Sequence, residues 1–281
     1  MNTSYFFNQT GRSREHARLL DATWLDDVPV ELRKRGLKAR TAVALEANDV
    51  ASLRMFSEER LQLARETGDP VQESAALNML ATSAFLGGDL EAAQRWYEDA
   101  VTVARATGDH QLVSGALANY GRFERDNGNI ARSRELLEEN LEVSRAVGNE
   151  LDVAWAVKEL AQTAISADDV SSASELAEEG FEIAGRLGLS VVLGDLVFTV
   201  ARLATGMKRP RDGAVLFGAV DAHDERLGYE HTPELTWWWS LRDELASALG
   251  ELEFRAAVAE GRALELDAAV ARARAFLETP S

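Results

Sequence analysis

The chain has 281 residues, of which 46% are hydrophobic and 27% charged, and 30 basic and 47 acidic side chains give it a formal net charge of −17. A chain this negative repels the phosphate backbone, which argues against direct nucleic-acid contact. It has no apolar run of about 18 residues, no basic-then-apolar N-terminal segment and no cysteine, so we expect a cytoplasmic protein without membrane contact, disulfides or thiolate chemistry.

The first 30 residues precede the regular part of the chain. Residues 1–12 have no helical pattern, and we interpret them as an irregular lead. Residues 13–30 carry an amphipathic helical pattern that breaks at Asp26-Asp27-Val28-Pro29. We interpret this helix as the second half of a preceding repeat, which makes Trp24 a candidate interface residue at the edge of the fold.

Residues 31–228 read as about five copies of one unit. The period is clearest over residues 71–150, which form two 40-residue copies end to end. Five glycines close the copies at the same spacing of 40: Gly68, Gly108, Gly148, Gly188 and Gly228. A fixed period of this size is typical of a solenoid, in which each unit buries its apolar face against its neighbours.

Each copy contains two helical patterns joined by a short turn. In the copy that begins at residue 71, apolar residues recur at helical spacing over 76–84 and again over 90–103, on either side of Gly87-Gly88-Asp89. The closing glycines suit a left-handed position after a helix. Four residues are predicted to cap the second helices: Asp49, Asp89, Asn129 and Asp169. The repeating unit is therefore a helical hairpin.

Small residues recur at one site of each helix and let helix backbones approach closely. In the first helices the site holds Thr41, Ala81, Gly121, Ala161 and Ala201, and in the second helices it holds Leu53, Ala93, Ser133, Ala173 and Gly213. This pattern resembles the tetratricopeptide repeat (TPR). We expect an all-α fold, a TPR-like right-handed α-solenoid of about five hairpins with a C-terminal helical cap.

Residues 229–281 leave the period and are expected to cap the solenoid with three helices, over 232–249, 251–261 and 266–277. The first contains Trp237, Trp238 and Trp239, which cannot share one helix face because successive residues differ by about 100°. At least one indole is therefore expected to be partly exposed. Either the indoles pack on the last repeat, or they form an interface for a partner or a homodimer.

The C-terminal part of the chain carries a second resemblance, on Leu216, Phe217, Gly218, Ala219, Leu227, Gly228, Leu249, Gly250, Phe254, Glu260, Gly261, Ala263, Leu264, Ala268, Ala269 and Val270. With these residues the segment resembles the end of actinobacterial ATP-dependent transcriptional regulators of the LuxR and AfsR kinds, which are signal-transduction ATPases. The resemblance implies a TPR region that receives a signal or a partner for an ATPase and a DNA-binding domain. Neither a GxxxxGK[ST] phosphate loop nor a separate helix-turn-helix unit is found, so we expect an excised sensor region or a stand-alone relative.

The first helix of each hairpin is expected to line a concave groove. Basic side chains there bind carboxylate or phosphate, and aromatic ones supply apolar walls. We therefore expect a protein, a peptide or a small anionic ligand. The candidate groove residues are Asn78, Arg122, Arg125, Trp155, Lys158, Gln162, Phe198 and Arg202.

An alternative interpretation is that these cations only bridge neighbouring helices. The acids available for such pairs are Glu124, Asp126, Glu159 and Asp195. The binding hypothesis predicts that removing Arg122 and Lys158 together leaves the fold intact and abolishes binding.

Catalytic and metal sites find little support in the sequence. His16, His110, His223 and His231 are scattered, and His223 with Glu230 and His231 lacks the spacing of a metal-binding motif. We expect neither an enzyme nor a cofactor, but a binding module. The competing class is an oligomerisation or assembly scaffold without a small-molecule ligand.

Overall fold

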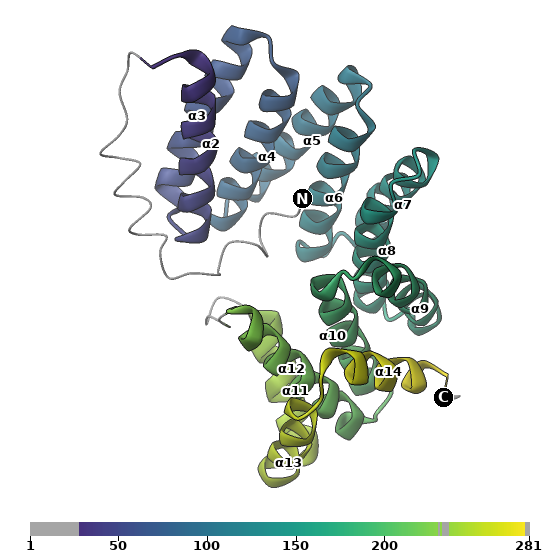
Figure 1. Ribbon diagram of the computed structural model, residues 1–281. Helices are drawn as coiled ribbons and strands as arrows, with labels where there is room; N and C mark the ends of the chain where they lie inside the picture. The colour runs from purple at the N-terminus through teal and green to yellow at the C-terminus, as the bar shows by residue number, and fades with distance from the viewer. Residues whose placement is uncertain (1–27, 230, 232–235, 279–281) are drawn as a thin grey trace. The chain divides into compact units, whose positions relative to one another are not determined.

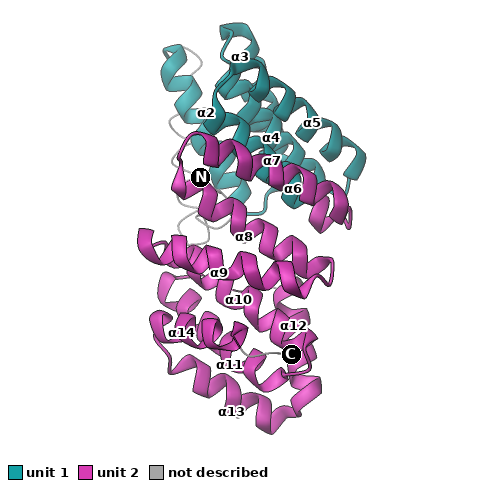
Figure 2. Cartoon of the chain, turned by 90° about the vertical axis from the view of Figure 1, so that its right-hand side faces the viewer, with its two compact units in different colours: residues 1–123 teal, residues 124–281 magenta. Residues whose placement is uncertain are grey.

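The computed structural model describes residues 28–229, 231 and 236–278, and all its regular elements within these ranges are α-helices. The helix expected over 13–30, with Trp24, lies largely outside these ranges. The chain divides into two compact units, residues 1–123 and 124–281 (Figure 2). The helices are α2 (Val30–Glu46), α3 (Val50–Thr67), α4 (Pro70–Leu86), α5 (Leu90–Thr107), α6 (His110–Asp126), α7 (Ile130–Ala146), α8 (Glu150–Ser166), α9 (Val170–Leu187), α10 (Ser190–Gly206), α11 (Pro210–Leu227), α12 (Thr236–Leu249), α13 (Glu251–Arg262) and α14 (Leu266–Leu277).

The helix starts confirm the 40-residue period. The first helices of the last four hairpins begin at Pro70, His110, Glu150 and Ser190. The second helices of all five hairpins begin at Val50, Leu90, Ile130, Val170 and Pro210. Consecutive helices pack together as hairpins within each unit, α2 with α3 and α4 with α5 in the first, and α8 with α9 and α10 with α11 in the second (Figure 1). The boundary between the two units falls within α6, whose last turn belongs to the second unit.

Local sequence explains where the helices end. The side chains of Asp49, Asp89 and Asp169 accept hydrogen bonds of 3.0–3.1 Å from backbone N–H groups three residues later, as expected for N-caps. Asn129 occupies the same place, but its side chain donates to Glu124 instead of capping α7. The prediction of a side-chain cap at Asn129 is therefore wrong. The five closing glycines have left-handed φ angles between 60° and 79°.

The fifth hairpin departs from the others at its inner turn. Arg209 stands at the N-cap position of α11, and its side chain makes no capping hydrogen bond. It instead pairs with Asp212 at 2.9 Å and lies over the ring of Phe276, 4.3 Å from the ring centroid. At this turn, an arginine that packs on α14 replaces an acidic cap.

The small sites predicted from the repeat are all buried. This holds for the five positions of the first helices and for the five of the second helices. Side-chain volume at these positions limits how closely neighbouring helices approach. The spacing of small residues therefore identified the packing surface of the hairpins correctly.

The first unit is built around apolar residues of α3, α4 and α5, among them Leu61, Leu77 and Ala100. Its aromatic side chains form a further cluster. Tyr97 of α5 lies 5.9 Å from Tyr120 and 5.1 Å from Phe123, both of α6, measured between ring centroids. These rings fill the space between the second hairpin and the following helix.

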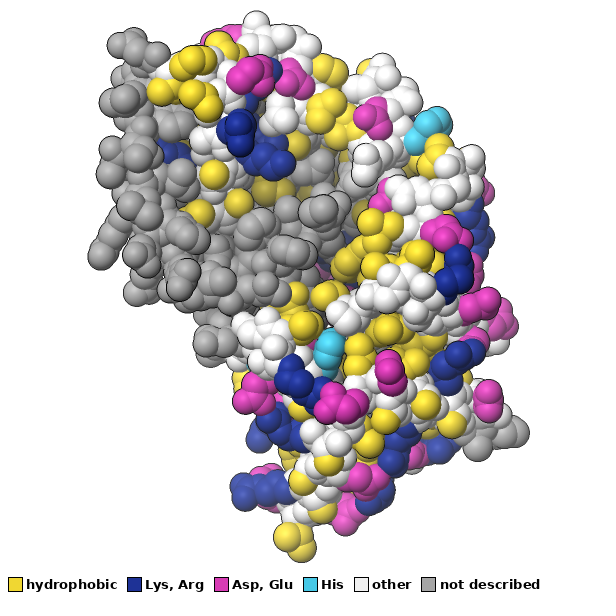
Figure 3. Space-filling model, viewed as in Figure 1, with side chains coloured by type: hydrophobic (Ala, Val, Ile, Leu, Met, Phe, Trp, Pro, Cys, Tyr) yellow, Lys and Arg dark blue, Asp and Glu magenta, His cyan; other side chains and the backbone are white. Residues whose placement is uncertain are grey.

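The second unit has a larger core, made by residues from α8 to α14. Helices α11 and α13 approach each other closely: a Cβ on Gly261 would lie 1.9 Å from the backbone oxygen of Val215, and one on Gly218 would lie 2.3 Å from that of Val258. Only glycine fits at such distances. Basic and acidic side chains intermingle on the surface of α11 and α13 (Figure 3), as in the ion pairs of Arg211 with Glu253 and Glu260.

The three C-terminal helices occur where the sequence predicts them, and the three tryptophans of α12 lie in different environments. Trp238 is 2% exposed, Trp239 is half-buried and Trp237 is 43% exposed. The prediction that at least one indole is partly exposed is confirmed. None of the described helices is both long enough and apolar enough to cross a membrane.

Candidate functional site

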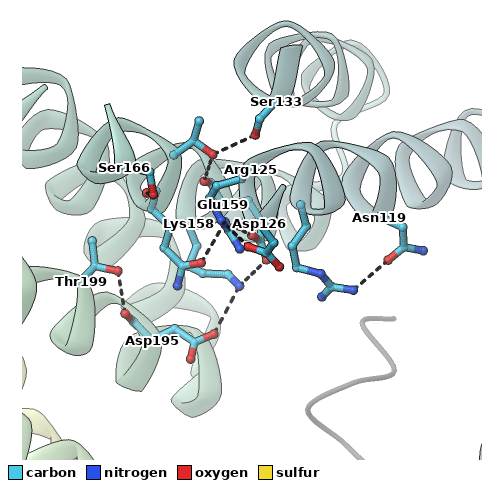
Figure 4. A network of polar contacts seen from close by, with 12 residues as sticks. Asn119, Arg125, Asp126, Ser133, Lys158, Glu159, Ser166, Asp195 and Thr199 are labelled. Atoms are coloured by element: carbon cyan, nitrogen blue, oxygen red, sulfur yellow. Dashed lines mark hydrogen bonds and ion pairs between the residues drawn. The ribbon is translucent and has the colours of Figure 1, made fainter. Parts of the chain in front are cut away.

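Charged side chains from the end of α6, from α8 and from α10 meet within the second unit (Figure 4). Lys158 of α8 is only 3% exposed. Its Nζ lies 2.6 Å from Oε1 of Glu159 and 3.3 Å from Oδ2 of Asp195, and 4.9 Å from the ring centroid of Trp155. Two buried carboxylates and an aromatic face therefore surround this ammonium group.

Arg125 belongs to the same network. Its Nη1 lies 2.6 Å from Oε2 of Glu159 and donates to Oε1 of Gln162 at 3.1 Å, while its Nε lies 3.2 Å from Asp126. Burial opposes the charge of this guanidinium, but the attraction of Glu159 and Asp126 outweighs burial, and the pKa of Arg125 is raised. Arg125 and Lys158 thus carry charges that nearby acids balance.

Arg202 of α10 contrasts with both. It is half-buried, and among the described residues it has no hydrogen bond and no ion pair. Burial lowers the pKa of Arg202, and the positive charge of Arg125 lowers it further, while Glu244 and Asp126 attract the guanidinium without forming an ion pair. Arg202 is therefore a cation partly removed from water that has no hydrogen-bond partner among the described residues.

Aromatic side chains adjoin Arg202 on α10. Phe198, one helical turn earlier, is 6% exposed and packs against Trp237 and Trp238 of α12 at centroid distances of 5.0 Å and 5.3 Å. Trp238 is also stacked on His231 at 3.6 Å. Phe198 is thus a buried support for α12 rather than an open wall, and the exposed aromatic surface belongs to Trp237.

The remaining groove candidates, Asn78 and Arg122, lie in the first unit. Asn78 is 6% exposed and donates to the backbone oxygen of Ser74. Its Oδ1 accepts a 3.4 Å hydrogen bond from Asn119, whose own Oδ1 accepts one of 3.4 Å from Arg122. These side chains form a polar ladder between α4 and α6.

The sequence predicted Lys158 to line an open groove, but its side chain is buried. A buried ammonium that balances two acids is part of the fold, so the expectation that Lys158 is removed without harm to folding is revised. The cation-pairing alternative describes Arg125 and Lys158 in the structure. Sequence reasoning also missed Asn119 and Glu244. Asn119 lies three residues before the groove candidate Arg122 on the same helix, so helical spacing could have indicated it, whereas Glu244 lies beyond the period.

The histidines do not form a metal site in the part of the chain that the structure describes. No group of three or more His, Asp or Glu side chains there is suited to a metal ion, and Glu230 lies outside the described residues. His231 hydrogen-bonds Asp224 at 3.0 Å, and His223 is buried. His231 thus contacts α11 through Asp224.

Comparisons with known proteins place the fold. No protein-family model and no curated protein matches the sequence. Among solved structures, aspartyl phosphate phosphatase F from Bacillus subtilis is similar with a TM-score of 0.61 at 12% identity, over 94% of this chain and 71% of that one. BtubC from P. vanneervenii is similar with a TM-score of 0.55 at 16% identity, over 89% of this chain and 91% of that one.

A third similar structure is a signal-transduction ATPase with numerous domains (STAND) from Pyrococcus horikoshii that carries a tetratricopeptide repeat sensor. The TM-score is 0.58 at 14% identity, over 88% of this chain but only 40% of that protein. At identities this low, the three likenesses concern the fold. The chain has an all-α, TPR-like helical repeat fold, in agreement with the fold class expected from the sequence.

Proposed function

We propose that this chain is a non-catalytic binding module that receives an acidic group of a protein or peptide partner at Arg202 in its second unit. The observation that carries the proposal is the state of this one side chain. Arg202 is half-buried and has neither a hydrogen bond nor an ion pair among the described residues. Arg125, whose charge acts on Arg202, has its acidic partners already in place.

A guanidinium without an ion pair in this setting is better suited to binding a ligand than to stabilising the fold. Desolvation and like-charge repulsion both oppose it in the free protein, and the attraction of Glu244 and Asp126 does not outweigh them. A carboxylate offers two oxygens that match the planar fork of arginine, so bound ligand would supply the missing hydrogen bonds. With a net charge of −17, the chain has many acidic side chains elsewhere, yet none of the described acids forms an ion pair with Arg202.

We further propose that the partner belongs to a bacterial signalling system, with this chain as the sensor or protein-interaction region of a transcriptional regulator. Two observations support this context. The C-terminal residues resemble those of the ATP-dependent regulators, and one similar structure is a STAND protein with a tetratricopeptide repeat sensor. The competing proposal is an assembly scaffold, which the exposure of Trp237 favours.

The test is selection of a random dodecapeptide phage library on the purified full-length chain at low ionic strength. We expect the recovered peptides to be enriched in Asp and Glu, and the enrichment to disappear with Arg202→Gln. Arg255→Gln is the matched control, because Arg255 is an exposed arginine of α13 in the same unit, and its one ion pair among the described residues is with Glu251 on its own helix.

Two results would contradict the proposal. One is acidic enrichment that persists unchanged in Arg202→Gln, and the other is no enrichment on the unmodified chain. Sedimentation at several concentrations is run in parallel. A mass that rises with concentration, together with no peptide enrichment, favours the assembly scaffold.

A further inference from the structure

The exposed indole of Trp237 packs against two buried aromatic side chains, Phe198 and Trp238. Its ring stands edge-on to Phe198 at 5.0 Å with an interplanar angle of 83°, and edge-on to Trp238 at 6.0 Å with an angle of 84°. Trp238 is itself 2% exposed and stacked between Phe198 and His231. An aromatic side chain fixed in this way loses little conformational freedom when a ligand covers it.

The helix register places this indole and Arg202 along one strip of surface. Phe198 and Arg202 are four residues apart on α10, and Trp237 and Glu244 are seven residues apart on α12, so each pair shares a helix face. Phe198 contacts Trp237, and Glu244 acts electrostatically on Arg202. The two helices therefore present the indole at one end of the strip and the guanidinium about one to two helical turns further along.

The geometry points to a two-part recognition surface, in which Arg202 receives a carboxylate and Trp237 covers a large apolar side chain of the same peptide. This inference rests on the proposed function and adds the second half of the recognition. One to two helical turns correspond to roughly 5–10 Å. An extended peptide advances about 3.3 Å per residue, so the two ligand groups lie within about three residues of each other.

Charge complementarity limits the occupant further. Glu244 lies on the same strip as Arg202 and is exposed, so it repels a second carboxylate next to the first. A run of acidic residues is therefore a poorer ligand than a single acid beside an apolar residue. The preferred partner is a peptide segment that combines one Asp or Glu with a nearby Phe, Trp or Leu.

The experiment uses four acetylated octapeptides on a Gly/Ser host that carry Phe-Ser-Glu, Gly-Ser-Glu, Phe-Ser-Gln or Gly-Ser-Gln at the centre, so that both variable side chains lie on one face. They are named by the variable residues as the Phe-Glu, Gly-Glu, Phe-Gln and Gly-Gln peptides. Binding is followed by fluorine NMR of the full chain labelled with 5-fluorotryptophan, and the Trp237 signal is assigned by its absence in Trp237→Ser. We expect the Phe-Glu peptide to shift the Trp237 signal and to bind about tenfold more tightly than the Gly-Glu peptide, since burial of an aromatic side chain supplies that difference.

Variants separate the two halves. Trp237→Ser should make the Phe-Glu and Gly-Glu peptides equal, while Leu252→Ser, which removes an 88% exposed side chain of α13, should leave the tenfold preference intact. Arg202→Gln should make the Phe-Glu and Phe-Gln peptides equal. Equal binding of Phe-Glu and Gly-Glu by the unmodified chain overturns this inference and leaves the proposed function standing. Equal binding of the Phe-Glu and Phe-Gln peptides by the unmodified chain, or no binding of any peptide, overturns both this inference and the proposed function.

Discussion

Lys158 on α8 and Arg202 on α10 lie on first helices of consecutive repeats, and both place a positive charge largely out of water. Lys158 has two carboxylates within 3.3 Å, whereas Arg202 has no ion pair among the described residues. The α8 region therefore resembles a structural ion network, whereas we propose that the α10–α12 region is a binding surface. Basic residues on one face of a repeat protein have different roles, and the pairing of their charges distinguishes them.

The largest expected effect comes from removing the charge of Lys158, which two carboxylates balance. Lys158→Met removes the ion pair of Asp195, which is 6% exposed, so we expect a loss of about 3–5 kcal/mol in the free energy of unfolding, measured by urea denaturation. Adding Asp195→Leu should restore most of this loss, because an apolar pair replaces the charged one. A single-variant loss below about 1 kcal/mol would show that Lys158 is not structural and would remove the contrast with Arg202.

Removing the charge of Arg202, which has no ion pair among the described residues, should increase the free energy of unfolding. Arg202→Met eliminates a desolvated charge that Arg125 repels, so we expect the free energy of unfolding to rise by about 1 kcal/mol. The measurement is the same urea titration, with Arg255→Met as the control, which should change stability by less than about 0.5 kcal/mol. A clear loss of stability would mean that Arg202 contributes to the fold and would argue against the binding site.

A smaller effect is expected when an acid is added beside Arg125. Gln162→Glu places a carboxylate at the side chain that already accepts from Arg125 at 3.1 Å. We expect a gain of up to about 1 kcal/mol in urea denaturation and weaker binding of acidic peptides, because the new charge attracts the neighbouring guanidinium groups. The gain should shrink in the Arg202→Met background. An equal gain in both backgrounds would indicate that Arg202 takes no part.

The sequence predicted the fold in detail, but it did not distinguish the paired cations of the candidate site from Arg202. Gly188 and Asp169 set helix ends through interactions with their own neighbours in the chain, so a local pattern was enough. Asn129 shows the limit of that reasoning, because Glu124, five residues earlier, takes its side chain away from the cap. Glu244 was not predicted as a neighbour of Arg202, since it lies after the last repeat and no period relates the two.

The sequence by itself determined the 40-residue period, the hairpins, the small packing sites and the three C-terminal helices, because these follow from residue size, helical spacing and backbone conformation. Only the tertiary structure decided which cations are balanced and which indole is exposed. Arg125 reaches Glu159 across 34 positions, and Trp237 meets Phe198 across the space between two helices. Such contacts depend on the rotation and stagger of packed helices, and a shift of one residue turns a side chain by about 100°.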